Sequence, residues 1–371
     1  MHSSAEVVIA LIAAFAVTLL LVPAIEGPAQ RLGLMDHPDY RKRHKRPTPL
    51  TGGLGIFAGF IIGMLVFGIA FTPYWTLIVG MVVLLIVGLV DDLVEISAKA
   101  RFLIQIGVAC LMVYGGGMEV RVLGEIFGPA YGPVGLGFFA GPFTVACVVF
   151  MINAINMTDG LDGLAGGIGM IMFLLMALAG WLDGAPGELI SIGLLMALAT
   201  AGFLVHNIRI PGREQARAFL GDTGSMVLGY SIAWLAVALG TREGGGIYPI
   251  TIALLLIVPG VDTVSLFLRR IHLGRSPFSA DRTHLHHIIR RCGYSCAATV
   301  HIIHLAIIGT GLAGILAWQY GWAEWALFVF AAGGMVGYQI LLANAHRIMR
   351  WHHRRRRFLR IRAEREARES G

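Results

Sequence analysis

Long apolar segments separated by short polar loops occupy most of this chain. Each segment is close to the roughly 20 residues that an α-helix needs to cross a bilayer. Long strands of alternating polar and apolar residues, which a membrane β-barrel requires, are absent from the sequence. The pattern predicts an all-α, polytopic integral membrane protein with about eleven transmembrane helices. Their expected limits are 5–26, 50–70, 74–90, 100–114, 139–157, 164–181, 188–207, 219–239, 248–268, 298–318 and 322–345.

The composition agrees with this class of protein. Hydrophobic residues make up 56% of the 371 residues and charged residues only 14%, which excludes a soluble globular protein. Neither a low-complexity linker nor a long soluble insert interrupts the apolar segments. We therefore predict a single transmembrane domain over residues 1–345, followed by a basic tail over residues 346–371.

The basic residues predict how the chain is oriented. If the N-terminus lies outside, all but two of the 29 Lys and Arg residues fall in inward loops or in the tail; the exceptions are Arg121 and Arg242. Positive residues favour the cytoplasmic side, so we expect the N-terminus outside and the C-terminus in the cytoplasm. Because the basic tail directly follows a span, anionic lipid headgroups explain it better than nucleic acid does.

Five aspartates stand at the ends of predicted spans. An ionised carboxylate beside hydrocarbon is costly, so such groups are candidates for function. Several carboxylates close together would also repel each other unless a cation joined them. The combination indicates a site at the membrane border for a divalent metal and a phosphorylated substrate. The five residues are Asp91, Asp92, Asp159, Asp162 and Asp222.

Asp91 and Asp92 follow the third predicted span, at the end of its helix that prefers cations. One of them could simply cap the next helix, but Ser97 is better placed to do so. A structural role thus explains the pair poorly, and we interpret it as functional. On this reasoning, replacing either residue with Asn relieves repulsion and leaves stability near that of the wild type.

Two further polar segments border predicted spans. NAINMTDGLDGLAGG carries Asn153 and Asn156, three residues apart on one helix face, before two Asp-Gly pairs. Turn chemistry explains the Asp-Gly pairs but not the two asparagines, and the spacing does not match a calcium-binding EF loop. Asp222 in FLGDTGS lies near a helix N-terminus, where an acid or a phosphate is favourable. Alone it would be an ordinary cap, but beside the other acids it is a candidate metal ligand.

A basic loop with three histidines follows the ninth predicted span. Arginine matches phosphate oxygens bidentately, so contact with a diphosphate is the favoured interpretation. Zinc binding lacks the usual helical pattern, and a solvated basic face remains the alternative for the arginines. Asp262, inside that span, either lines the site or pairs with a neighbouring polar helix. The loop residues are Arg269, Arg270, Arg275, Arg282, His284, His286 and His287.

The motifs together resemble a known family. GLVDDLVEISAKARFLIQ, NAINMTDGLDGLAGG, FLGDTGS and SPFSADRTHLHH, in this order, are similar to those of the polyprenyl-phosphate N-acetylhexosamine-1-phosphate transferase superfamily. The resemblance extends to RKRHKRPTPLTGG after the first span and covers nearly the whole chain. The histidine motif resembles the branch that uses N-acetylglucosamine and undecaprenyl phosphate, because the phospho-MurNAc-pentapeptide branch has three consecutive histidines.

The resemblance implies a reaction between UDP-N-acetylglucosamine and undecaprenyl phosphate that yields the lipid diphosphate sugar and UMP. It implies Mg²⁺, or Mn²⁺, as the cofactor and the cytoplasmic face of a bacterial inner membrane as the location. It also suggests a homodimer and membrane lipids as partners, and no nucleic acid. The envelope polymer that the product feeds stays open among O-antigen, enterobacterial common antigen, teichoic acid and arabinogalactan.

The resemblance also implies roles for individual residues. Asp222 and Asn156 would hold the metal, and Asp91 or Asp92 would deprotonate or orient the lipid phosphate. Phe219 would stack on uracil. The remaining catalytic candidates are Asp159, His284, His286 and His287, and the remaining substrate-binding candidates are Lys45, Arg46, Arg101, Asn153, Gly160, Leu161, Asp162, Arg270 and Arg282.

Two alternatives remain. The same chemistry could use another UDP-N-acetylhexosamine or UDP-MurNAc-pentapeptide. A protein of a different class, a secondary transporter for an anionic solute, would place its binding groups near the bilayer midplane. The acids and histidines of this sequence map instead to inward loops and span ends, which favours the enzyme.

Overall fold

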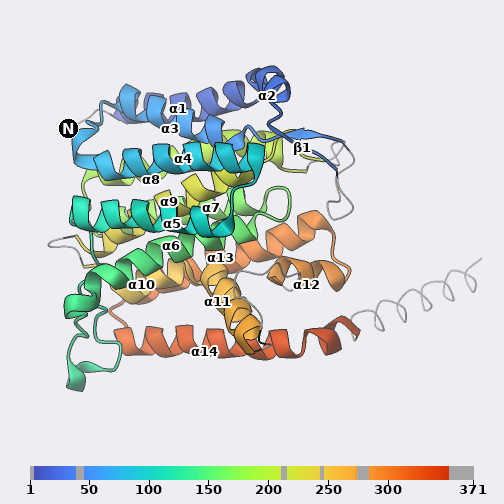
Figure 1. The fold of residues 1–371 in the computed structure, drawn as a ribbon. Coiled ribbons are helices and arrows are strands. Elements are labelled where there is room, and N and C mark those ends of the chain that lie inside the picture. The colour runs from blue at the N-terminus through green and yellow to red at the C-terminus, as the bar shows by residue number, and fades with distance from the viewer. Residues whose placement is uncertain are drawn as a thin grey trace, which may run out of the picture.

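Helices that run side by side form most of the structure, and helix α11 (Ile257–His272) departs from their common direction (Figure 1). The computed structural model describes residues 4–38, 46–209, 215–242, 246–272, 274 and 284–350. The predicted all-α, polytopic membrane class is confirmed. The division into a domain over 1–345 and a tail over 346–371 stays a prediction.

The elements follow the apolar segments of the sequence closely. The first seven helices are α1 (Ser4–Ala24), α2 (Glu26–Leu32), α3 (Gly52–Phe67), α4 (Trp75–Val94), α5 (Ala98–Cys110), α6 (Ala140–Thr158) and α7 (Leu164–Leu182). The others are α8 (Gly187–Asn207), α9 (Gly221–Gly240), α10 (Pro249–Leu255), α11 (Ile257–His272), α12 (Leu285–Arg291), α13 (Cys296–Gln319) and α14 (Glu324–Ala343). Strands β1 (Met35–Asp36) and β2 (Thr48–Pro49) pair antiparallel between α2 and α3.

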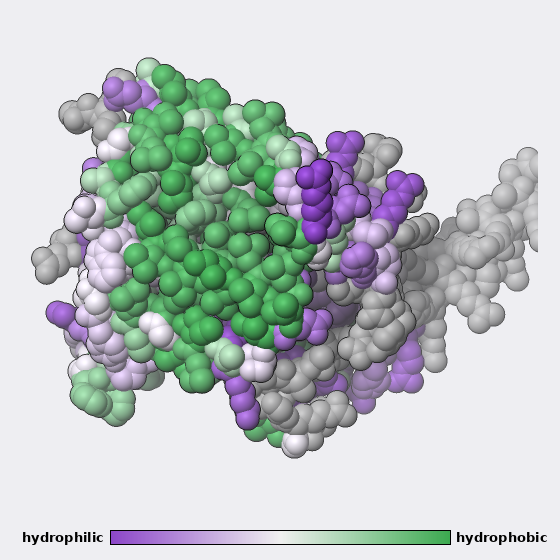
Figure 2. Space-filling view, turned by 45° about the horizontal axis from the view of Figure 1, so that its top comes forward, coloured by the Kyte–Doolittle hydropathy of each residue, from purple (hydrophilic) through white to green (hydrophobic). Residues whose placement is uncertain are grey.

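Nine helical segments in the described part of the chain are long and apolar enough to cross a membrane. The pair α10 and α11 brings the number to ten if it is one span, and α3 is an apolar helix shorter than these. Every range predicted as a span overlaps one of these segments. Figure 2 shows the corresponding surface, a broad hydrophobic area with hydrophilic residues toward both ends.

The ninth predicted span, 248–268, is not one straight helix. It bends by 81° between α10 and α11. Pro259 lies in the first turn of α11, where its missing N–H group breaks no hydrogen bond within the helix. A proline is therefore compatible with a new helix that begins at Ile257, but not with a helix that continues through this position.

Helix α9 lies at the centre of the bundle, where α3, α4, α6 and α7 pack around it. Two glycines allow the closest approaches. A Cβ atom at Gly88 of α4 would lie 2.3 Å from the Cα atom of Thr223, and one at Gly53 of α3 would lie 2.5 Å from the Gly224 nitrogen. Backbone thus packs on backbone around the first turn of α9, which fixes the position of that turn relative to α4.

Gly88→Ala should destabilise the protein by about 1–3 kcal/mol, because overpacking at this contact forces α4 and α9 apart. The matched control is Gly107→Ala in α5, where a Cβ atom would meet no other atom within 4 Å. The control should be neutral or stabilising by about 0.5–1 kcal/mol, since alanine favours the helix. Unfolding of the purified protein in detergent measures both changes. Equal stability of the two variants would show that α4 and α9 do not pack closely at Gly88.

Candidate active site

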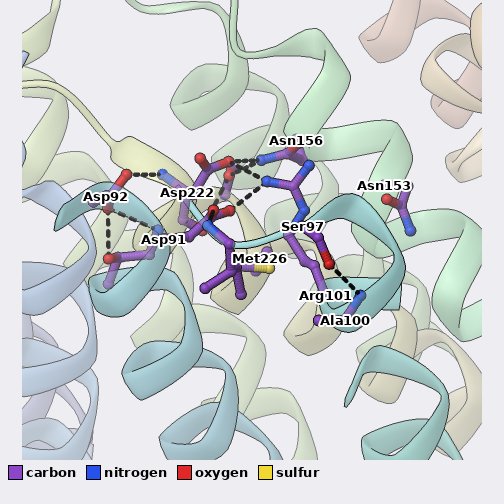
Figure 3. A network of polar contacts seen from close by, with 12 residues as sticks. Asp91, Asp92, Ser97, Ala100, Arg101, Asn153, Asn156, Asp222 and Met226 are labelled. Atoms are coloured by element: carbon purple, nitrogen blue, oxygen red, sulfur yellow. Dashed lines mark hydrogen bonds and ion pairs between the residues drawn. The ribbon is translucent and has the colours of Figure 1, made fainter. Parts of the chain in front are cut away.

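Polar side chains from four helices meet at the end of the bundle that carries β1 and α12 in Figure 1; we call this the site end. Asp91 and Asp92 come from the last turns of α4, and Asp222 comes from the first turn of α9. Asn156 and Arg101 join them from α6 and α5 (Figure 3). The structure thus brings together the three separate acidic motifs that the sequence suggested.

Arg101 lies between two of the carboxylates. Its guanidinium donates a short hydrogen bond to Asp91 Oδ2, and the same nitrogen lies 3.7 Å from Asp222 Oδ1. The other oxygen of Asp91 accepts a hydrogen bond of 2.9 Å from the Ile96 nitrogen. Arg101 therefore balances negative charge that would otherwise be repulsive in a poorly hydrated place.

The two asparagines of α6 face different partners. Asn156 donates to Asp222 Oδ1 and, at 2.9 Å, to Ser225 Oγ. Asn153 instead donates to Gln105 Oε1 at 2.6 Å and to the Val149 carbonyl at 2.8 Å. Asn156 thus belongs to the acidic cluster and Asn153 lies beside it (Figure 3). Gln105 and Ser225 were not among the predicted site residues, although a glutamine within an apolar helix is a usable signal.

Asp92 caps the N-terminus of α9 from another helix. Its carboxylate accepts hydrogen bonds from the Asp222 nitrogen at 2.8 Å, the Thr223 nitrogen at 3.1 Å and the Thr223 hydroxyl at 2.7 Å. The residue that precedes α9, Leu220, has no side-chain acceptor to do this. Asp92 is unfavourably placed for the dipole of its own helix but well placed for that of α9.

This role of Asp92 changes the stability that we expect for the Asp92→Asn variant. From α4 alone, Asn at this position is expected to relieve repulsion. Three donors bind the Asp92 carboxylate, and an amide in its place would turn an N–H group toward some of them. Gly221 makes room for this contact, since its φ angle is 72° and a Cβ atom would lie 2.7 Å from Asp92 Oδ2. By contrast, Ser97 caps α5 as predicted, accepting from the Ala100 nitrogen at 3.2 Å.

The loop after α6 adds two more carboxylates. Asp162 accepts hydrogen bonds from Arg209 Nε at 2.8 Å and from the Ala216 nitrogen at 3.1 Å, so it holds both ends of the segment between α8 and α9. Desolvation of the Asp159 carboxyl group, followed by the charges of Asp222 and Asp162, raises its pKa above the ordinary value; since the residue is exposed, the desolvation is incomplete. The charge of Asp36 on β1 acts in the same direction, and this residue was not among the predicted ones.

The three histidines pack together beside this loop. The rings of His284 and His286 are stacked with centroids 5.6 Å apart, and the centroids of His286 and His287 are 4.1 Å apart. A Cβ atom at Gly160 would lie 2.6 Å from His286 Nε2, so glycine lets α12 approach the loop. Burial, followed by the charges of His287 and His284, lowers the pKa of His286 to about 3. His286 is therefore a neutral ring, and its buried Nε2 has no hydrogen-bond partner among the described residues.

The remaining predicted residues occupy varied places. The main chain of Phe219 is held by Pro49 and Gly52, through hydrogen bonds of 2.9 and 3.0 Å. The carbonyl of Arg46 accepts from Gln215 at 3.2 Å. Leu161 is half-buried beside Gly160, and Arg270 is buried at the end of α11. Lys45 and Arg282 lie outside the described residues.

The donor set suits a hard divalent cation. Carboxylate and amide oxygens are available at Asp222 and Asn156, and magnesium is usually held by one or two carboxylates together with substrate phosphates. Among the described residues, no group of three or more His, Cys, Asp or Glu side chains forms a complete metal cage. A site of this kind would depend on the substrate for further ligands.

Comparisons with known proteins define the class. Residues 74–240, which include the acidic motifs, match the model of glycosyl transferase family 4. An undecaprenyl-phosphate alpha-N-acetylglucosaminyl 1-phosphate transferase of Escherichia coli O157:H7 is 33% identical over 356 residues, which cover 94% of this chain and 95% of that protein. The chain therefore belongs to glycosyl transferase family 4.

Two more relatives carry similar names. A probable undecaprenyl-phosphate N-acetylglucosaminyl 1-phosphate transferase of Bacillus subtilis is 37% identical, covering 81% of this chain and 82% of that protein. An undecaprenyl-phosphate alpha-N-acetylglucosaminyl 1-phosphate transferase of Yersinia pestis is 32% identical, covering 92% of this chain and 93% of that protein. The family resemblance predicted from the motifs is confirmed.

Asp92→Asn should lower the stability of the protein by about 1–3 kcal/mol, because it leaves donors at the start of α9 unsatisfied. Glu95→Gln is the matched control, an exposed acid three residues away whose loss should change stability by less than about 0.5 kcal/mol. Unfolding in detergent compares the two variants. Wild-type stability of Asp92→Asn would show that the carboxylate does not cap α9.

Proposed function

We propose that this protein transfers N-acetylglucosamine 1-phosphate from UDP-N-acetylglucosamine to undecaprenyl phosphate. A phosphate oxygen of the lipid attacks the sugar-linked phosphorus, the diphosphate bond breaks, and UMP leaves. Relatives whose names state this acceptor and this sugar phosphate match almost the whole chain. The observation that carries the proposal within the structure is the meeting of Asp91, Asp222, Asn156 and Arg101 at the site end.

The proposed roles follow from the chemistry of the reaction. Phosphoryl transfer depends mainly on in-line positioning of the reactants and on stabilisation of negative charge. Arg101 is already held beside Asp91 and Asp222, so a small movement would bring its guanidinium to diphosphate oxygens. His284, His287 and Arg270 offer further donors. Phe219 would stack on uracil from a main chain fixed by Pro49 and Gly52.

The two aspartates of α4 would have different tasks. The carboxylate of Asp92 binds the backbone of α9, and Asp92 would therefore act by keeping Asp222 in place. Within the described part of the chain, the Asp91 carboxylate accepts hydrogen bonds from Ile96 and Arg101. It is therefore the better candidate to orient or deprotonate the lipid phosphate once Arg101 turns to the substrate. Asp159, an exposed carboxyl group whose pKa is raised, is the second candidate for this task.

Magnesium, or manganese, would be held by Asp222 and Asn156. The cation would neutralise charge on the diphosphate and on the leaving UMP. Among the described residues, no donor contacts the carbonyl oxygen of Asn156, which leaves this oxygen for a metal. Asp222 is fixed by the cap that Asp92 places on its backbone.

The topology belongs to the same proposal. Counting α3 and the bent pair α10–α11 as spans gives eleven crossings in the described part of the chain. The distribution of Lys and Arg would then place the N-terminus outside and the C-terminus in the cytoplasm. This orientation places the site end at the cytoplasmic face of the bacterial inner membrane. A nucleotide sugar would then arrive from the cytoplasm and the lipid from the bilayer. A transporter would instead need its binding groups near the midplane, and the carboxylates gather at the ends of α4, α6 and α9.

The decisive experiment measures UMP release by purified protein with undecaprenyl phosphate and a panel of UDP-sugars. We expect UDP-N-acetylglucosamine to be the preferred donor over UDP-N-acetylgalactosamine and UDP-MurNAc-pentapeptide. Excess EDTA should abolish turnover, and Mg²⁺ or Mn²⁺ should restore it, because the carboxylates need a cation to accept a diphosphate. Preference for another UDP-sugar would show that the proposed donor is wrong. Full turnover in EDTA would exclude a requirement for a divalent metal. Solute counterflow without UMP release would favour a transporter.

A further inference from the structure

A second buried carboxylate binds groups at the start of α12 and in α14. Asp262 of α11 is 5% exposed, and its oxygen Oδ2 lies 2.9 Å from Nδ1 of His284. Its oxygen Oδ1 accepts a hydrogen bond of 3.0 Å from the Leu285 nitrogen and a short one from the Tyr338 hydroxyl of α14. Each oxygen of Asp262 thus already accepts a hydrogen bond from a neighbouring element.

The contact with His284 determines which ring nitrogen carries a proton. An ionised carboxylate only accepts hydrogen bonds, so the proton between the two groups belongs to Nδ1 of His284. The other nitrogen, Nε2, lies on the opposite side of the ring and away from Asp262.

The contact with Leu285 fixes the helix that carries the other two histidines. Helix α12 has only seven residues, and its preceding residue, His284, provides no side-chain cap. Asp262 supplies the missing acceptor from α11, just as Asp92 does for α9. The positions of His286 and His287 on α12 therefore depend on the same carboxylate that holds His284.

Tyr338 connects this arrangement to the lipid-facing helix α14. Little of α14 is buried, and two side-chain contacts link the helix to α11. The hydroxyl of Tyr338 bonds Asp262, and Ser265 of α11 lies 3.8 Å from the sulfur of Met335. Tyr338 completes the set of donors around Asp262 and restricts its rotation.

We propose that Asp262 is a positioning residue, assisted by Tyr338, which orients His284 so that Nε2 faces the diphosphate of the substrate. This inference rests on the proposed function, because His284 is assigned there as a donor to the diphosphate. Asp262 itself touches no reacting atom. Its effect on turnover passes through the orientation and protonation of His284 and through the placement of α12.

Kinetics of three variants test this role. Asp262→Asn should lower kcat/KM by about 10–100-fold, the range typical of residues that orient a functional histidine. Tyr338→Phe should give a smaller loss, because His284 and Leu285 keep their acceptor. Thr263→Val is the matched control, since the buried hydroxyl of Thr263 has no hydrogen-bond partner among the described residues. The control should keep wild-type kinetics, and a wild-type kcat/KM for Asp262→Asn would overturn the proposal.

A double-mutant cycle separates positioning from general stability. If Asp262 acts through His284, then Asp262→Asn should cost less than about twofold in a His284→Gln background. If the double variant instead loses as much activity as the two single losses combined, Asp262 supports the fold without serving His284. That result would overturn the proposal. Thermal unfolding of each variant in detergent shows that the rates refer to folded protein. Tyr338→Phe keeps the cycle informative if Asp262→Asn fails to fold.

A measurement without substrate separates this inference from the proposed function. Nitrogen NMR of protein labelled with ¹⁵N-histidine, with His284 assigned from the signal lost in His284→Gln, reports which ring nitrogen is protonated. We expect a protonated Nδ1 in the wild type and in Thr263→Val, and a changed state in Asp262→Asn. An unprotonated Nδ1 in the wild type would refute the orientation whatever the enzyme's substrate is. The expected NMR result in a protein that releases no UMP would instead refute the function alone.

Discussion

The structure depends on carboxylates that cap helices other than their own. The side chain of Asp92 in α4 accepts hydrogen bonds from the first turn of α9, and that of Asp262 in α11 accepts one from the start of α12. Both capped helices carry motif residues, and neither has a side-chain cap of its own. Free N–H groups at a helix start attract negative charge, and a hydrogen bond to a charged acceptor is stronger than one between neutral groups. Each cap therefore adds a charged hydrogen-bond acceptor to the packing that positions the start of a functional helix.

The caps also explain how several acids coexist beside hydrocarbon. Asp92 is stabilised by the start of α9, Asp91 by Arg101, and Asp162 by Arg209 and a backbone amide. Among the residues that the structure describes, Asp222 has the Asn156 amide and the more distant Arg101 as partners, and Asp159 lies near the charges of other acids. The carboxylates with the weakest compensation are those nearest to where a cation would bind. This uneven distribution of charge is what makes the site end suited to a phosphorylated substrate.

The helical framework was predictable because hydrophobic length alone determines it. The apolar segments located α1, α3 to α9 and α13 to within a few residues, and the ordered motifs identified the family. The bend between α10 and α11 was missed, since both halves are apolar and Pro259 is tolerated in a first turn. The acidic cluster was predictable from charge near spans, but partners such as Gln105 and Ser225 depend on tertiary packing. The role of Asp92 was missed for the same reason, because a dipole argument on one helix cannot show which helix lies next to it.

The most direct test of the central claim is paramagnetic resonance of Mn²⁺ bound to the purified protein with UDP-N-acetylglucosamine. We expect coupling between the metal and phosphorus, which places the cation on the diphosphate, and a large loss of Mn²⁺ affinity in Asp222→Asn. Asp183→Asn, whose carboxylate pairs with Arg242 at the other end of the bundle, should bind Mn²⁺ like the wild type. Phosphorus coupling that survives unchanged in Asp222→Asn would contradict a cation site built on the first turn of α9.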